Sequence, residues 1–346
     1  MPRPTVYLPT LDRWLAVAES HLASALVAEP ARSRLEATAH HPPADSLGVL
    51  EVRLAAGEPE VDLSVRLTQP DQARQMAGQL SPSRAQELLC RWAEGEWEQV
   101  STLWLEFDLD REPADLPLPV LCAQLPPETD PLWLVDALLP VLHGRPLGAA
   151  QRETVLLCAR EIPSPARLLY AFSLLSRGTA AVRLEILGLD AAKRMEYLGH
   201  VAPPTRATAA TLAPLLEGAE NPHLSFDIDT VGDRGQVLPR IGLEGAFPRQ
   251  PPREPRWAEL LGRLVDRGLC SPAKRDALLA WPGHDSFWTA PDRWPVEAGV
   301  GGFCVRFLSH LKVVGQPGRP PQAKAYLGFG RLADSASPPA CDIVKP

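Results

Sequence analysis

The sequence predicts an α/β fold made of five repeats, each with two helices followed by two antiparallel strands. Amphipathic segments of helical length come in pairs, and each pair precedes two segments in which apolar and polar residues alternate. Short polar, Gly- or Pro-bearing links join the two strands of a pair, as hairpins require. Ten antiparallel strands can close into a barrel surrounded by helices, which leaves no exposed strand edge.

The repeats follow one another without a linker. The expected helix pairs are 11–27 with 31–39, 71–79 with 83–95, 131–142 with 149–162, 191–201 with 207–218, and 256–269 with 271–281. The expected strand pairs are 47–55 with 61–68, 103–110 with 120–125, 168–176 with 181–187, 223–230 with 237–247, and 302–314 with 322–330. Proline pairs fall in the connections, where they end helices. Residues 1–333 are therefore expected to form a single barrel domain, and 334–346 a disordered tail.

Charge and cysteine usage exclude several classes of protein. The 35 basic and 42 acidic residues leave a net charge of -7, which argues against a nucleic-acid-binding surface. No apolar run reaches membrane-spanning length and no signal-peptide pattern begins the chain, so we expect a cytoplasmic protein. We also expect a monomer. The six cysteines form no CxxC pair, which argues against a cysteine zinc site and a disulfide framework.

Alternation along the strands predicts what the barrel contains. In segment 103–110, Leu103, Leu105 and Phe107 share one face with Leu109, while Trp104, Glu106, Asp108 and Asp110 share the other. The apolar face must meet the helices, so the polar face points inward. The other strand pairs divide in the same way. An open sheet covered by helices on one side would show the same alternation, with the polar face in water.

Five successive ααββ units with a polar strand face resemble the ABBA-type aromatic prenyltransferases. The resemblance spans residues 11 to 330 and rests on element order, without a diagnostic motif. It implies a ten-stranded barrel, the PT barrel, whose lumen holds a prenyl diphosphate and an aromatic or peptide acceptor. No DDxxD or NSE motif occurs, which argues against the helical isoprenyl synthases and terpene cyclases.

A prenyl diphosphate needs Arg and Lys donors in the lumen while its C–O bond ionises. The candidate diphosphate-binding residues on the polar face are Arg53, Arg66, Arg183, Arg240, Arg306, Lys312, Lys324 and Tyr326. The last two predicted strands carry no carboxylate, so they are expected to form an unpaired positive patch that includes His310. The alternative for each cation is an ion pair with an acidic residue of the same face.

Glu106 is the candidate catalytic base, and His310 a second candidate that could relay the proton. The alternative for Glu106 is an ion pair with Arg53 or Arg66. Trp104 and Tyr170 are the candidate aromatic residues beside the acceptor. No cofactor is required by the resemblance, although Asp108 with Asp110, and Asp227 with Asp229, are candidate oxygen ligands for Mg²⁺.

The connection 282–300 carries several aromatic residues. It could be a hydrophobic segment anchored on helix ends or an aromatic cover over a barrel mouth.

The predicted function is transfer of a prenyl group from a prenyl diphosphate to an electron-rich aromatic acceptor, a peptide side chain or a small metabolite. Two alternatives stay open. One is a non-catalytic barrel that binds an anionic ligand or a peptide as an accessory protein in natural-product biosynthesis. The other is an open-sheet interaction domain without a small-molecule site.

Overall fold

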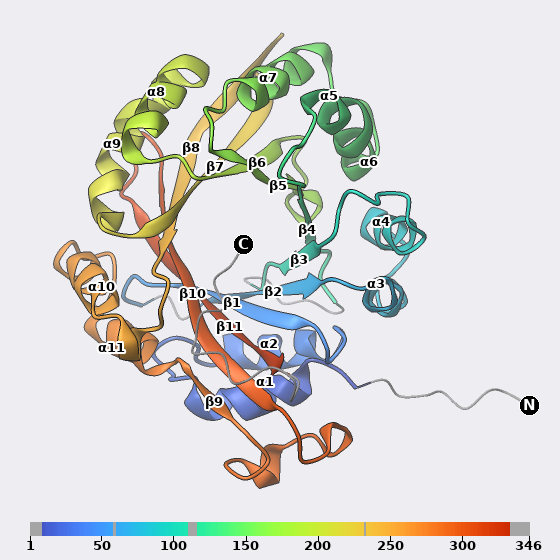
Figure 1. The fold of residues 1–346 in the computed structure, drawn as a ribbon, viewed down its shortest axis with the longest axis vertical. Coiled ribbons are helices and arrows are strands. Elements are labelled where there is room, and N and C mark those ends of the chain that lie inside the picture. Colours follow the sequence, from blue (N-terminus) through green and yellow to red (C-terminus); the bar gives the residue numbers. More distant parts are fainter. Residues whose placement is uncertain (1–8, 58–59, 110–115, 232, 333–346) are drawn as a thin grey trace, which may run out of the picture.

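Ten antiparallel strands form a closed ring in the computed structural model, which describes residues 9–57, 60–109, 116–231 and 233–332. The strands follow one another around the ring in the order β11-β1-β2-β3-β4-β5-β6-β7-β8-β10, and β10 pairs with β11 to close it. Figure 1 looks into this ring and shows the helices around its outside. The predicted barrel is therefore confirmed, and the open sheet is excluded because no edge of the ring is left unpaired among these ten strands.

Each repeat contributes two helices or helical segments and one hairpin. The first two repeats contain α1 (Asp12–Ala18), α2 (Ala31–Ala39), β1 (Leu47–Arg53), β2 (Val61–Leu67), α3 (Pro70–Ala77), α4 (Arg84–Ala93), β3 (Leu103–Phe107) and β4 (Val120–Gln124). The third contains α5 (Pro131–Trp133), a π-helical turn (Leu134–Leu138), α6 (Leu139–His143), α7 (Ala149–Arg160), β5 (Arg167–Ser173) and β6 (Val182–Leu187). The last two contain α8 (Ala191–Val201), α9 (Arg206–Leu212), β7 (Glu220–Val231), β8 (Arg234–Ala246), α10 (Arg256–Asp266), α11 (Pro272–Ala280), β9 (Gly283–Asp285), β10 (Phe303–Gly315) and β11 (Gln322–Leu332).

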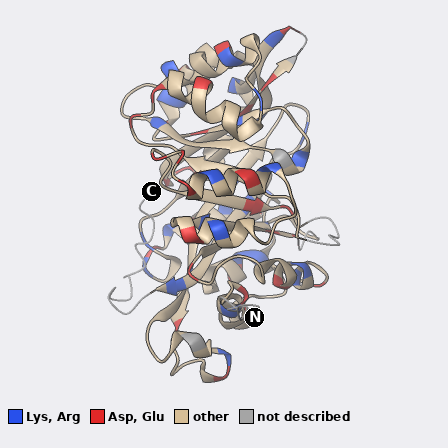
Figure 2. Cartoon of the chain, turned by 90° about the vertical axis from the view of Figure 1, so that its right-hand side faces the viewer, with Lys and Arg blue, Asp and Glu red and all other residues tan. Residues whose placement is uncertain are grey.

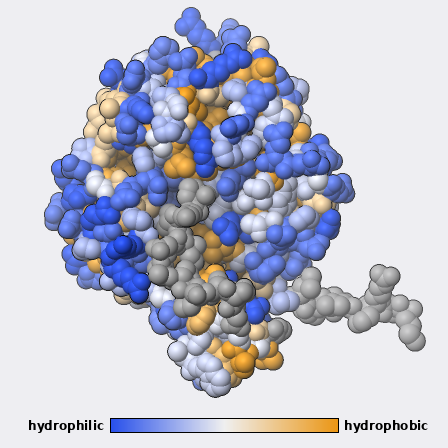
Figure 3. Space-filling view, viewed as in Figure 1, coloured by the Kyte–Doolittle hydropathy of each residue, from blue (hydrophilic) through white to orange (hydrophobic). Residues whose placement is uncertain are grey.

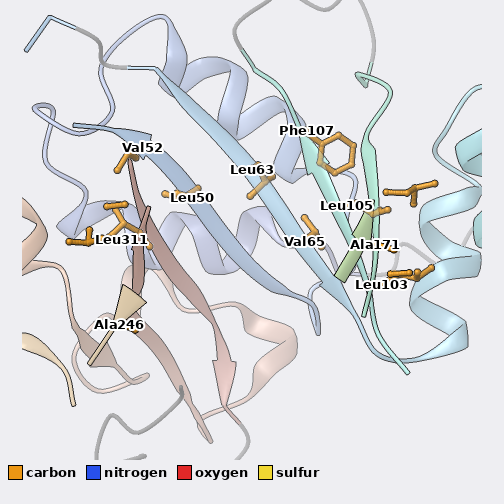
Figure 4. Close-up of a cluster of buried hydrophobic side chains, with 14 of the residues drawn as sticks. Leu50, Val52, Leu63, Val65, Leu103, Leu105, Phe107, Ala171, Ala246 and Leu311 are labelled. Carbon is orange, nitrogen blue, oxygen red and sulfur yellow. The ribbon is translucent and has the colours of Figure 1, made fainter. Parts of the chain in front are cut away.

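The apolar side chains of the strands lie between the barrel and its helices. Leu50, Leu63 and Leu105 come from neighbouring strands and are fully buried in this layer, as Figure 4 shows. Helix α10 contributes Trp257 and α4 contributes Leu88 to the same core. Charged residues of both signs mark the helices that face the viewer in Figure 2. Burial of the apolar strand faces by helices leaves the opposite faces for the lumen.

Several elements differ from the sequence prediction. The helix expected over 207–218 ends at Leu212 and continues as a 3-10 turn. The first helix ends at Ala18, continues as one 3-10 turn (Glu19–His21), and does not reach residue 27. The third repeat's first helix contains a π turn just before Pro140, which lacks the N–H that a continuous α-helix would use. Strand β9, which was not predicted, adds three residues to β10 outside the ring. Asp110 and the tail 334–346 lie outside the described residues.

Strand β10 contains a β-bulge that changes which of its residues face the lumen. Its register on β11 runs from Phe307 opposite Gly328 and Leu308 opposite Leu327 to His310 opposite Tyr326, so Ser309 is extra. An extra residue exchanges the two faces of a strand. Phe307 therefore points inward, whereas Arg306 points outward.

Candidate functional site

The lumen contains a cavity of about 410 Å³ lined by residues from all ten strands of the ring. Its wall carries six Lys and Arg side chains, five carboxylates, two histidines and several aromatic rings. Of the twelve candidate catalytic, diphosphate-binding and aromatic residues, ten line this cavity, namely Arg66, Trp104, Glu106, Tyr170, Arg183, Arg240, His310, Lys312, Lys324 and Tyr326.

The other two, Arg53 and Arg306, do not line the cavity. Arg53 lies at the end of β1 and pairs with Asp62 (3.0 Å). The prediction that Arg306 points into the lumen is wrong because of the β10 bulge. Its guanidinium donates to the backbone carbonyl of Trp281 and pairs with Asp285 at 3.3 Å, on the outer side of the sheet. Phe307, which alternation assigned to the helix face, takes a place in the lumen instead.

The prediction that the cations of β10 and β11 form an unpaired positive patch is also wrong. Carboxylates of the neighbouring strands form ion pairs with these cations. Lys312 lies 2.5 Å from Glu244 of β8. Lys324 and Tyr326 both donate to Glu51 of β1. Burial opposes ionisation of these acids, but their cationic partners prevail, so the pKa of Glu51 is held well below its usual range and that of Glu244 falls to about 2. Both carboxylates are therefore ionised at neutral pH.

Two histidines lie beside the same carboxylates. His223 Nδ1 is 2.6 Å from Glu185 Oε1, and His310 Nε2 is 3.3 Å from Glu244 Oε2. Burial lowers the pKa of His310 to about 4, which leaves its imidazole neutral. Burial also lowers the pKa of His223, but the nearby carboxylates of Glu185 and Glu244 have the larger effect. The pKa of His223 is therefore raised above its usual value. The rings of His310 and Tyr326 stack with centroids 4.0 Å apart.

Glu106 is held by an arginine that the sequence analysis did not identify. Arg177 lies 2.6 Å from Glu106 and 2.9 Å from Asp108. It occupies a 3-10 turn directly after β5, where strand alternation makes no prediction. The expected alternatives, Arg53 and Arg66, are not the partners of Glu106 in the described ion pairs. The neighbouring Arg183 pairs with Asp227 at 2.7 Å.

Arg66 and Arg240 differ from the other lumen cations. Within the described ranges, neither has a carboxylate at ion-pair distance nor a hydrogen-bond acceptor. Loss of water contact lowers the pKa of both guanidiniums, and nearby Arg183 adds to this effect on Arg240. Both side chains are nevertheless exposed, and a guanidinium without a partner among the described residues keeps donors available for an anion. These two arginines are therefore the lumen cations whose donors are least engaged by the described residues.

Two of the four carboxylates proposed for Mg²⁺ are engaged by arginines, and Asp229 accepts a hydrogen bond from the backbone N–H of Thr230. Asp108 pairs with Arg177 and Asp227 with Arg183, and Asp110 lies outside the described residues. A binding role for Mg²⁺ at these positions stays a prediction.

Connection 282–300 packs on the outside of the barrel. Trp294 contacts Trp14 of α1 edge to face, with ring centroids 5.2 Å apart. None of its described residues lines the cavity. Trp288, by contrast, is 78 % exposed, and hydrophobic residues gather at the lower end of the molecule in Figure 3, where Figure 1 shows this connection. This arrangement favours the first interpretation of connection 282–300, a hydrophobic segment anchored on helices, over an aromatic cover for the cavity.

Five ααββ units that close ten antiparallel strands into one ring are the architecture implied by the resemblance noted above. The fold is the PT barrel. No protein-family model and no curated protein matches the chain. Among solved structures, it is similar to a ternary complex of the prenyltransferase PriB with L-tryptophan and dimethylallyl thiolodiphosphate, at 14% identity and a TM-score of 0.45, covering 96% of this chain and 100% of that one.

A second similar structure is AnaPT from Neosartorya fischeri, at 11% identity and a TM-score of 0.43, covering 93% of this chain and 87% of that one. The fold assignment rests on the strand pairing of this PT barrel itself, and the chemistry is argued from its lumen. No helix in the described part of the chain has both the length and the apolar character needed to cross a membrane.

Proposed function

We propose that this PT barrel is a prenyltransferase that moves a prenyl group from a prenyl diphosphate to an electron-rich aromatic acceptor. The observation that carries the proposal is the lumen, in which two arginines that form no ion pair with a described residue and a set of aromatic rings line the same cavity. In the reaction the C–O bond of the donor breaks, diphosphate leaves with the electron pair, and the allylic carbon bonds to the acceptor ring. The ring then loses a proton.

Arg66 and Arg240 are the proposed first contacts for the diphosphate, because no carboxylate of the described residues lies at ion-pair distance from their donors. Lys312 and Lys324 each have one carboxylate partner and keep further N–H donors for the same anion. Trp104, Tyr170 and Tyr326 line the cavity and supply ring faces for an allylic cation.

Glu106 and His310 are the proposed proton acceptors. The carboxylate of Glu106 lies on the lumen side of β3 but must share its charge with Arg177. His310 is neutral because burial lowers its pKa, so one ring nitrogen can accept a proton.

Turnover with dimethylallyl or geranyl diphosphate tests the reaction. Acceptors would be indole and phenol derivatives and peptides containing Trp or Tyr, with the mass gain of one prenyl group as the readout. Glu106→Gln should lower turnover by a factor of about 10² to 10⁴ if this residue is the base. Glu259→Gln, an exposed acidic position on α10, is the control and should leave turnover unchanged.

One observation favours a second candidate, a non-catalytic barrel that binds an anionic ligand or a peptide. The lysines of β10 and β11 are engaged by buried carboxylates, which reduces the positive charge available to a diphosphate. Saturable binding of the donor without transfer to any acceptor would favour this reading. Prenyl transfer to any of these acceptors would exclude it.

A further inference from the structure

Three side chains with metal-binding atoms meet on one wall of the lumen. Glu185 comes from β6, His223 from β7 and Glu244 from β8, and one ligand atom of each lies within 4.8 Å of the others. The strand register explains the meeting, because His223 lies opposite Glu244 on one side and opposite Leu187, two residues from Glu185, on the other. All three residues line the cavity.

The spacing suits direct coordination of a small cation. Ligand atoms at about 2.0–2.2 Å from a tetrahedral ion lie roughly 3.3–3.6 Å from one another. His223 Nδ1 is 2.6 Å from Glu185 Oε1 and 3.7 Å from Glu244 Oε2, so the observed separations bracket that range. Small side-chain movements would place an ion among the three atoms.

Burial and charge favour a cation at the same place. The side chains of Glu185 and Glu244 are each 5% exposed, and that of His223 is 19% exposed. Lys312 already balances the charge of Glu244, whereas Glu185 has His223 as its one described ion-pair partner, so beside a neutral imidazole a cation would balance the second buried carboxylate.

Contacts with Lys312 and His310 fix the orientation of the Glu244 carboxylate. Lys312 binds Oε1 at 2.5 Å, whereas Oε2 is the atom directed to His223. His310 Nε2 also contacts Oε2, at 3.3 Å, from β10. Such outer contacts fix the direction of a ligating carboxylate.

We propose that Glu185, His223 and Glu244 form a binding site for Zn²⁺ or a similar late first-row divalent ion, with the remaining coordination position open to the lumen. One imidazole and two carboxylates suit such an ion better than Mg²⁺, which prefers oxygen ligands alone. The site is distinct from the aspartates considered for Mg²⁺, and prenyl transfer does not require it.

Titration of the chelator-treated full-length protein with Zn²⁺ by calorimetry tests the proposal. We expect one equivalent to bind, and Mg²⁺ at the same concentrations to give no saturable heat. His223→Gln and Glu244→Gln should each weaken Zn²⁺ binding on the order of 100-fold. Co²⁺ should give a visible absorption band with the wild-type protein that both variants lack.

His200→Gln is the matched control, because His200 pairs with Glu161 at 3.7 Å on the surface and lines no described part of the cavity. It should keep one equivalent of Zn²⁺. A thermal melt establishes that each variant is folded, and Zn²⁺ should raise the melting temperature of the wild type but not of His223→Gln. If His223→Gln does not fold, Glu185→Gln replaces it. The proposal fails if folded wild-type protein binds no stoichiometric Zn²⁺, or if both site variants bind it as the wild type does.

Discussion

Gly328 shows how a single residue shapes the lumen. It lies on the inward face of β11 opposite Phe307, and a Cβ built on it would lie 2.1 Å from the Phe307 ring. The aromatic ring thus occupies space that only glycine leaves. The bulge and this glycine together allow Phe307 to enter the cavity wall.

Gly328→Ala should lower the free energy of unfolding by about 1–3 kcal/mol, because the ring must leave its position in a packed wall. Chemical denaturation of the purified protein measures the change. Gly262→Ala on α10 is the control, since nothing lies within 4 Å of its added methyl group. That variant should be more stable by up to about 1 kcal/mol, because alanine favours the helix. Equal effects of the two substitutions would contradict this packing.

The buried pair of Glu51 and Lys324 gives a second residue-scale prediction. Lys324→Met leaves the Glu51 carboxylate buried with Tyr326 as its remaining direct donor, so we expect a loss of roughly 3 kcal/mol or more. The double variant Glu51→Gln with Lys324→Met should regain most of that loss in the same denaturation assay.

An exposed ion pair provides the comparison. Asp71 and Arg74 lie 2.6 Å apart on α3 but are 93% and 57% exposed. Asp71→Asn should therefore cost less than about 1 kcal/mol. A Lys324→Met effect as small as this one would show that the lumen pair is well solvated.

At the scale of elements, the end of α6 carries a buried ionisable group. Burial, helped by nearby Arg145, lowers the pKa of His143 from 6.5 to about 4. Its Nε2 has no hydrogen-bond partner among the described atoms. Between pH 4 and 6.5 the unfolded chain therefore binds more protons at this residue than the folded chain does.

The free energy of unfolding should consequently fall as the pH drops from 6.5 to 4, with His143 contributing on the order of 3 kcal/mol. His143→Gln should remove that part of the acid sensitivity, measured by urea denaturation across this pH range. His200→Gln, at an exposed position, should retain it. Parallel stability curves for the wild type and His143→Gln would contradict the burial of a neutral imidazole.

The elements themselves could be predicted well from local patterns. Helices α2 and α8 begin and end where their amphipathic pattern does, and the strands match to within a few residues. The β10 bulge could not be predicted, because one inserted residue leaves the alternation on either side intact. Arg306 and Phe307 were consequently assigned to the wrong faces.

At the scale of the whole molecule, ring closure determines the electrostatics of the lumen. Glu51 reaches Lys324, 273 residues away along the chain, because β1 pairs with β11. Glu244 reaches Lys312 because β8 pairs with β10. Alternation placed both lysines on the inward face. It could not tell which strands would be neighbours, so the cations were expected to be unpaired.

In the closed barrel, Arg66 and Arg240 are the lumen cations that form no ion pair with a described residue. We therefore propose that these two arginines bind the diphosphate of a prenyl donor. Charge-assisted bonds to phosphate contribute about 1.5–3 kcal/mol each, which corresponds to tenfold or more in affinity.

Calorimetric titration with geranyl thiolodiphosphate, an unreactive donor analogue, tests this claim most directly. We predict saturable binding that weakens as salt is added, and dissociation constants raised about tenfold or more by Arg66→Gln and by Arg240→Gln. Arg267→Gln, at the exposed end of α10, should bind as the wild type does. Absence of saturable binding at millimolar analogue, or equal affinity of the wild type and both lumen variants, would contradict the claim.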